Sequence, residues 1–172
     1  WDRCVISDSH SLQDARVRYD SVGANVAQGK PTTQSGTKWG GNSSRAVDAN
    51  LDPDYDGGSC THTPPQDDPW LEVDLEASYN VTTVRITNRF GGGTRLDGFI
   101  IKVGDAVCGS SLVVPGGETG DFLCDPALIG STVRVELPGK RRVLTVTTLP
   151  ASAPRLIDVF LNRCASSRSL RL

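Results

Sequence analysis

Glycine and proline interrupt this chain so often that a long helix has no room in it. The 172 residues include 18 glycines and 10 prolines, and no stretch beyond about a dozen residues keeps apolar side chains at helical spacing. The segments between are rich in β-branched residues or alternate between apolar and polar ones, as strands do. We therefore predict an all-β domain, with strands spaced as in a sandwich. The predicted strands are 70–75, 81–87, 98–104, 132–137, 143–148 and 156–161.

A chain of this length fits one domain with short tails. We assign residues 1–23 to an N-terminal arm, in which 7–19 form a short helix or an irregular segment. Residues 24–164 form the domain, and 165–172 form a polar tail. Because the chain begins at Trp1 without the charged start and apolar stretch of a signal peptide, we favour a fragment of a larger protein with other domains.

The charges argue against two kinds of partner. The 18 basic and 20 acidic residues are spread along the chain and give a net charge of -2. We therefore expect no binding of nucleic acid or anionic lipid. The apolar runs fall far short of the roughly 20 residues that span a bilayer, so we also expect no membrane insertion.

The five cysteines favour an extracellular disulfide protein over a zinc or redox protein, because they form no Cys-x-x-Cys pair. Cys108 and Cys124 bracket a glycine-rich loop, 109–123, and we predict a disulfide between them that contributes about 3 kcal/mol. The pairing of the other three, Cys4, Cys60 and Cys164, stays open, and one thiol is left free or pairs with another chain. Glycosylation sequons at Asn42 and Asn80 agree with secretion.

Catalysis has few candidates. The only imidazole bases are His10 and His62, and no serine lies in a Gly-x-Ser-x-Gly turn. A glycosidase carboxylate pair can be judged only from its separation in space. We predict a protein that is not an enzyme.

Residues 48–58 carry an oxygen-bearing side chain at nearly every second position, a density that suits Ca²⁺. An EF-hand is excluded, because its required glycine and final acid fall on Pro53 and Ser59. The alternative is a solvated acidic turn.

A second cluster joins His62 to Arg89 and Arg95, which flank the glycine run 91–93. A guanidinium fork can hold two vicinal hydroxyls, an imidazole adds a donor or acceptor, and glycines let the backbone approach a ligand. This combination suits a sugar. The alternative is a set of surface residues with weak contacts.

The order of several motifs resembles the F-type lectins (fucolectins), a family within the wider discoidin-like, galactose-binding-like sandwiches. The Cys60-Thr61-His62-Thr63 block, followed by Asn88-Arg89 and Arg95, is the most specific part, and the resemblance covers roughly residues 24–161. The other matching motifs are 25–32, 46–48, 68–75, 84–87, 95–99, 103–105 and 135–139. The resemblance implies a jelly-roll β-sandwich with ligand-binding loops at one end.

The family's sugar motif is a His, then Arg-x-Asp after about 26 intervening residues, then a basic residue after four more intervening residues. Here 26 residues separate His62 from Arg89, whereas the Asp falls on Gly91 and Arg95 arrives one residue early. The resemblance implies that His62, Arg89 and Arg95 bind the ring oxygen and hydroxyls of L-fucose. Tyr55 is the favoured cover for the apolar face of the sugar.

Other residues compete for two of these roles. Trp39 and Phe90 are the alternatives to Tyr55. The carboxylates that we consider as substitutes for the missing Asp are Asp67, Asp68 and Asp97. Gly92-Gly93 stands where many members carry adjacent cysteines whose disulfide packs on the sugar.

The resemblance also implies a calcium site. Its ligands map to the Asp48 side chain, the backbone oxygens of Arg45 and Asn50, Ser59, and an acid on the last strand, Asp158. In the family a cysteine precedes that acid and pairs with the cysteine at position 60, but here Ile157 takes its place. We favour Cys60–Cys164 as the replacement, with Cys4–Cys164 as its rival.

The function that follows is a calcium-stabilised carbohydrate-binding domain that recognises terminal L-fucose or a similar sugar on glycans or glycoproteins. Single-site affinity is expected at about 10 μM to 1 mM, so that useful binding depends on multivalency. The alternative is a discoidin-like adhesion or structural module that has lost sugar binding and contacts protein or lipid. A third hypothesis is that the chain is a non-catalytic domain of a larger glycosidase.

Overall fold

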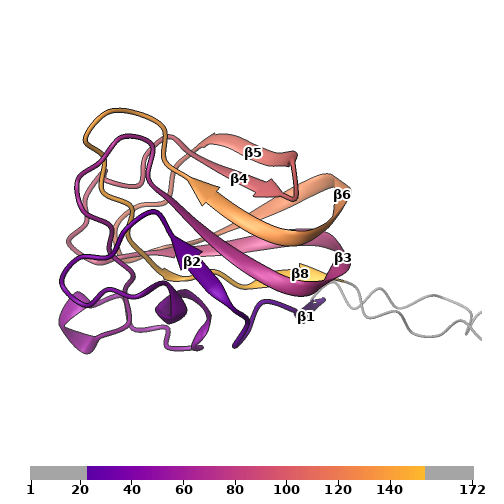
Figure 1. Ribbon diagram of the computed structural model, residues 1–172, viewed down its shortest axis with the longest axis horizontal. Coiled ribbons are helices and arrows are strands. Elements are labelled where there is room, and N and C mark those ends of the chain that lie inside the picture. Colours follow the sequence, from indigo (N-terminus) through magenta and orange to yellow (C-terminus); the bar gives the residue numbers. More distant parts are fainter. Residues whose placement is uncertain (1–22, 154–172) are drawn as a thin grey trace, which may run out of the picture.

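The computed structural model describes residues 23–153, a part of the chain that consists of β-strands, loops and two short 3-10 helices (Figure 1). The predicted all-β class is confirmed. The elements, in chain order, are β1 Ala24–Asn25, β2 Thr32–Gln34, η1 Ser43–Val47, η2 Tyr55–Gly57, β3 Trp70–Asn88, β4 Phe99–Val103, β5 Ala106–Leu112, β6 Thr119–Glu136, β7 Val146–Thr148 and β8 Ala151–Ala153.

The centre of the fold is a long antiparallel ribbon made by β3 and β6. Residues 70–74 of β3 pair with 132–136 of β6, and 79–87 pair with 119–130. The register shifts between Asp74 and Tyr79, where Glu76 has a φ of 62°. Figure 1 shows the ribbon bending back at this point, so each strand contributes one half to each layer. This bend converts one sheet into a sandwich.

The remaining strands complete the two layers. Strands β2 and β4 pair with the first half of β3 and the second half of β6, and β5 forms the outer edge against β4. Strands β7 and β8 pair with the second half of β3, and β1 pairs with β8. Inward-facing side chains of both layers, such as Leu71, Val84, Phe99 and Val135, are fully buried and form the core.

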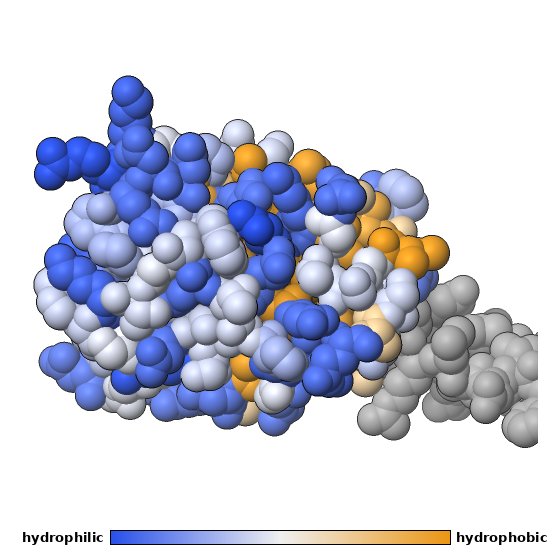
Figure 2. Space-filling model, viewed as in Figure 1, coloured by the Kyte–Doolittle hydropathy of each residue, from blue (hydrophilic) through white to orange (hydrophobic). Residues whose placement is uncertain are grey.

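Because β3 and β6 begin and end at the same side of the molecule, the long connections gather there, on the left in Figure 1. These connections are 35–69, 89–98 and 137–145. The prediction of loops clustered at one end is therefore confirmed. Figure 2 shows that hydrophilic residues cover this end, whereas apolar residues gather toward the opposite end.

Two parts of the strand prediction were wrong. The segments 70–75 and 81–87 belong to one continuous strand, β3, because its polar bend keeps strand pairing on both sides. Residues 109–123 are not one loop: they hold the end of β5 and the start of β6. As an edge strand, β5 exposes most of its residues, so its sequence lacks a regular apolar alternation.

The predicted disulfide between Cys108 and Cys124 is confirmed, and it joins β5 to β6. Of the predicted strand 143–148, only Val146–Thr148 forms a strand. The predictions for 7–19, 156–161 and 165–172 lie outside the described residues, as do Cys4, Asp158 and Cys164 and the domain boundary at 164. Within 23–153, no helix is long and apolar enough to cross a membrane.

Candidate sugar-binding site

The segment that carries His62 is fixed by a ladder of threonines. The backbone N–H groups of Thr61 and Thr63 donate to the carbonyls of Val146 and Leu144 at 2.9 and 3.0 Å. The two threonine hydroxyls also accept hydrogen bonds from the N–H groups of the same two partners. His62 lies between these anchors, so its backbone has little freedom.

An aromatic stack surrounds the His62 ring. Its centroid lies 4.8 Å from the ring of Trp39 and 5.7 Å from the ring of Tyr55. The Tyr55 hydroxyl donates to the carbonyl of Trp39 at 2.9 Å, which ties the two flanking loops together. The loop that carries Trp39 can lie this close because Gly41 has no Cβ, which would come within 2.5 Å of His62.

Arg89 completes the cluster. Its guanidinium carbon lies 4.3 Å from the centroid of the Tyr55 ring, a cation–π contact. Its loop is tied to the loop before η2 by the N–H of Phe90, which donates to the carbonyl of Pro53 at 2.8 Å. The structure therefore brings together three of the predicted sugar ligands, His62, Arg89 and Tyr55, from the connections 35–69 and 89–98.

Arg95 lies at the end of the same glycine loop and is exposed. Arg142 holds this loop, because its Nη2 donates to the carbonyls of Arg95 and Asp97 at 3.1 and 2.7 Å. The charge of Arg95 lowers the pKa of His62. The fourth predicted sugar ligand therefore lies on the same loop as Arg89, 89–98.

Buried polar atoms without partners gather at this cluster. Within the described residues, neither ring nitrogen of His62 has a hydrogen-bond partner, although the residue is only 1% exposed. The same holds for Nε of Arg89 and Oδ1 of the neighbouring Asn88. Since buried polar groups are almost always hydrogen-bonded, the two nitrogens of His62 and Nε of Arg89 are suited to the hydroxyls of a ligand.

The surroundings of His62 favour the neutral form of its imidazole. Burial lowers the pKa of His62, the positive charges of Arg89, Arg95 and Lys38 lower it further, and a contact with the backbone of Thr63 partly opposes them. A neutral imidazole offers one donor and one acceptor, which matches a sugar hydroxyl that both accepts and donates.

This lowered pKa predicts a pH-dependent stability. The unfolded chain binds a proton at His62 below its ordinary pKa of about 6.5, whereas the folded chain resists it, so stability is lost as pH falls below that value. We expect the urea midpoint of the wild type to drop more between pH 7.5 and 5 than that of His62→Gln. Identical pH profiles for the two proteins would contradict this account.

The carboxylates considered as substitutes for the missing Asp are engaged elsewhere or have no contact with the arginines. Asp67 and Asp68 accept hydrogen bonds from the N–H groups of Arg141 and Gly139 at 2.9 and 2.7 Å, which fixes the loop after β6. Neither Arg89 nor Arg95 forms an ion pair with any residue between 23 and 153. At the motif position, Gly91 has a φ of 70°, a conformation that favours glycine. The ring of Tyr55 takes over the contact with Arg89.

The acidic loop forms a chain of turns. The side-chain oxygens of Asp48, Asn50, Asp52 and Asp54 each accept the N–H of the residue two further on, at 2.9–3.1 Å. No group of three His, Cys, Asp or Glu side chains converges on one point in the described part of the chain. The acidic loop therefore has the hydrogen bonds of the plain turn that we considered as the alternative to a calcium site.

Oxygens do converge at Ser59, which is fully buried. Its hydroxyl contacts the carbonyl of Asp52 and, at 3.0 Å, the carbonyl of Asp54. A single hydroxyl hydrogen cannot satisfy both carbonyls, so three oxygen atoms meet with one proton among them. Such a set of neutral oxygens fits Ca²⁺. For Arg45, the prediction concerned its backbone oxygen. Its side chain donates to the carbonyl of Cys60 at 3.1 Å.

Cys60 is buried and forms no disulfide with any described residue. Its Sγ lies 3.4 Å from the Thr147 hydroxyl and 3.6 Å from the carbonyl of Pro53. The predicted pairing with Cys164 lies outside residues 23–153. A threonine on β7 therefore packs against this sulfur.

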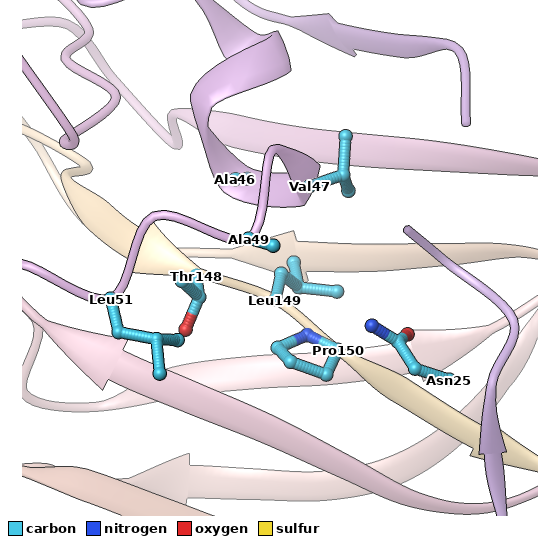
Figure 3. A pocket seen from close by; sticks show the side chains of 8 residues that line it. All are labelled: Asn25, Ala46, Val47, Ala49, Leu51, Thr148, Leu149 and Pro150. Carbon is cyan, nitrogen blue, oxygen red and sulfur yellow. The ribbon is translucent and has the colours of Figure 1, made fainter. Parts of the chain in front are cut away.

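A separate hollow of about 150 Å³ lies beside η1 and β7 (Figure 3). Its lining residues are Asn25, Ala46, Val47, Ala49, Leu51, Thr148, Leu149 and Pro150. The Asn25 Oδ1 and the Thr148 hydroxyl are occupied by contacts with Ala27 and Thr87 at 3.1 and 3.0 Å. With an apolar lining and its main polar atoms engaged, this hollow does not suit a sugar.

The residues of both sequons, Asn42 and Asn80, are exposed, so both predicted glycosylation sites are accessible.

Residues 45–147 match the family model of the NedA-like, galactose-binding domain. The fold and the site thus define a galactose-binding-like β-sandwich. Fucolectin-6 of Anguilla japonica is 37% identical over 140 residues, covering 77% of this chain and 72% of that relative. The chain belongs to the F-type lectin (fucolectin) family.

Solved structures agree with this assignment. The F-lectin from the serum of striped bass, Morone saxatilis, has a TM-score of 0.73 at 29% identity, covering 77% of this chain and 48% of that one. The lectin domain of lectinolysin, solved with Lewis b antigen, has a TM-score of 0.65 at 31% identity, covering 76% and 96%. This chain therefore spans about half of the striped bass lectin. The predicted β-sandwich is confirmed, and its family is one of lectins, which are not enzymes.

One member of the cluster was missed by sequence reasoning. Lys38 lies with its Nζ 4.7 Å from the centroid of the Trp39 ring, so it adds a positive charge at the far end of the aromatic stack. No motif spacing marks it.

Proposed function

We propose that this domain binds terminal L-fucose, or a sugar with the same arrangement of hydroxyls, at the cluster of His62, Arg89, Arg95 and Tyr55. Arg89 and Arg95 donate to ring oxygen and hydroxyls, and neutral His62 exchanges a hydrogen bond with the axial hydroxyl. The ring of Tyr55 packs against the apolar side of the sugar.

One observation carries the proposal: three buried polar atoms without partners among the described residues, on His62 and Arg89, lie at one cluster at the loop end. A ligand rich in hydroxyls would satisfy them, whereas an apolar ligand would leave each at a cost of about 1–3 kcal/mol. The relatives support the same chemistry, because they are fucolectins and a lectin domain complexed with Lewis b antigen.

The experiment that tests this proposal is a calorimetric titration with L-fucose, with its mirror image D-fucose as the matched control. We expect saturable binding of L-fucose with a Kd of about 10 μM to 1 mM and a much weaker response to D-fucose. No heat with millimolar L-fucose, on a protein that is demonstrably folded, would contradict fucose recognition. It would favour the adhesion module that contacts protein or lipid.

We also propose that Ca²⁺ stabilises the loops beside this site. Ser59 and the carbonyls around it supply oxygen ligands, Asp48 supplies a carboxylate, and Asp158 is proposed as the further acid. When bound, the ion would offset the repulsion between the carboxylates of 48–56 and fix the loop that carries Tyr55.

Calcium removal should lower the thermal stability of the domain. With calcium at about 100 times its Kd, we expect EDTA to lower the Tm by about 5–10 °C. The Asp48→Asn variant should lose this response, whereas Asp105→Asn, in the exposed turn between β4 and β5, should keep it. An unchanged Tm in scanning calorimetry of the wild type would refute the calcium proposal and leave the sugar site untouched.

An extracellular location and attachment to further domains of a larger chain complete the proposal. The disulfide between Cys108 and Cys124 supports an oxidising compartment. The striped bass relative comes from serum, and this chain covers 48% of it.

A further inference from the structure

The cations of the candidate sugar site have no ion-pair partner among the described residues. Within 23–153, the charges that act on the pKa of His62 are those of Lys38, Arg89 and Arg95, and all three are positive. The ion pairs formed within residues 23–153 use other cations. They are Lys30–Glu76, Arg85–Asp121, Lys102–Glu136, Arg134–Glu72 and Arg134–Glu136.

The positive charges are held in place by the aromatic stack. Lys38 lies over Trp39 at 4.7 Å, the rings of Trp39, His62 and Tyr55 follow, and Arg89 lies 4.3 Å from the Tyr55 centroid. One cation therefore caps each end of the stack. The ring of Tyr55 occupies one face of the Arg89 guanidinium but none of its N–H donors, so these donors remain for a ligand.

Carboxylates from the surrounding loops form no ion pair with Lys38, Arg89 or Arg95 within residues 23–153. Asp52 and Asp54 direct an oxygen to backbone N–H groups of their own loop, and Asp67 and Asp68 do the same for the loop after β6. The family's motif carboxylate is absent, because Gly91 stands in its place. Guanidinium groups without an acidic partner bind sulfate and carboxylate groups by paired, charge-assisted hydrogen bonds.

We infer that this site prefers an anionic form of its sugar, a fucose-like residue that bears a sulfate ester or stands beside a carboxylate-bearing sugar. The inference rests on the proposed function, since it concerns the same site. The anion takes the role of the missing carboxylate: it accepts hydrogen bonds from Arg89 or Arg95 and reduces the repulsion between them and Lys38. The buried Nε of Arg89 and the partnerless nitrogens of His62 remain for the neutral hydroxyls.

The test compares the affinities for L-fucose, each of its monosulfates, and a fucosylated trisaccharide that carries sialic acid next to the fucose. Titrations at 20 and 500 mM NaCl separate the contribution of charge to the affinity from the contribution of shape, because salt screens charges. We expect at least one anionic ligand to bind about tenfold more tightly than L-fucose at low salt, and most of this advantage to vanish at high salt. A gain for a monosulfate places the anion on the fucose ring, and a gain for the trisaccharide alone places it on the neighbouring sugar.

Two variants link the preference to this cluster. Gly91→Asp restores the motif carboxylate, and aspartate tolerates a positive φ better than most residues. Lys38→Gln removes the cation at the other end of the stack. Both should lower the anionic advantage at least threefold while L-fucose still binds, and Arg85→Gln, which breaks a surface ion pair on β3, should leave the advantage unchanged.

The two proposals fail in different ways. If L-fucose binds but no anionic ligand binds more tightly at low salt, the inference is overturned and the proposed function stands. An advantage that survives undiminished in both Gly91→Asp and Lys38→Gln overturns it as well. If neither L-fucose nor any anionic ligand binds to the folded protein, the proposed function itself fails.

Discussion

The Arg89→Ala variant should lose measurable binding of L-fucose. The change removes the guanidinium that lies on Tyr55 and whose buried Nε has no partner within the described part of the molecule. Two charge-assisted hydrogen bonds to sugar hydroxyls are worth about 3–5 kcal/mol together, which corresponds to a loss of at least about 100-fold. A site with a Kd near 100 μM would then bind above about 10 mM, beyond the range of calorimetric titration.

Two control variants show whether this loss belongs to the site. Arg85→Ala removes a cation of β3, the strand that precedes Arg89, which pairs with Asp121 on the surface, and we expect its affinity to match the wild type. Arg89→Lys keeps the charge but not the fork, so its affinity should be intermediate. If Arg89→Ala binds L-fucose as the wild type does, the sugar does not lie on this cluster, and the proposed site is wrong.

The sequence predicted the sheet well where side chains alternate, and poorly where a strand lies at an edge or bends. Segments 98–104 and 132–137 were found because their inner residues are apolar and buried, as Ile101 and Val135 show. Strand β5 was missed, because it is an edge strand whose polar and small residues need not alternate. The bend of β3 at Glu76 depends on pairing with β6, which a local pattern does not contain.

The sequence predicted only those members of the candidate site that belong to a recognisable motif. The spacing of His62 and Arg89 identified two members, and the structure brings them together through Tyr55. The contacts of Trp39 and Lys38 with that group come from folding of a distant loop, and the sequence marks neither contact. The sequence also could not show whether another carboxylate replaces the missing Asp, because this depends on the direction of each carboxylate in the neighbouring loops.

These contacts explain how the chain tolerates glycine at the motif position. A carboxylate would orient Arg89 by hydrogen bonds, whereas Tyr55 orients it through its ring and is itself held by its hydroxyl on the carbonyl of Trp39. The geometry of the guanidinium is thus maintained without a compensating negative charge. That exchange of a charged partner for a neutral one is the physical origin of the anionic preference proposed above.

The largest loss of stability should come from truncating Phe99. This residue is the first of β4 and connects the loop 89–98 to the core. Its side chain is fully buried, and its ring meets Phe122 edge-on at 5.3 Å and 90°. Truncating a fully buried phenylalanine leaves a cavity and costs about 3–5 kcal/mol. Since a domain of this size is stable by about 5–15 kcal/mol, we expect Phe99→Ala to lower the urea midpoint by about a fifth or more.

Phe90→Ala is the matched control for this prediction, because Phe90 lies at the other end of the same loop but is 66% exposed. Its truncation should change the free energy of unfolding by no more than about 0.5 kcal/mol. The contrast separates burial from residue type, since the two substitutions remove identical atoms. Equal losses of stability in the two variants would show that the loop between Arg89 and Phe99 is not packed as described above. The proposed arrangement of the sugar site would then be wrong as well.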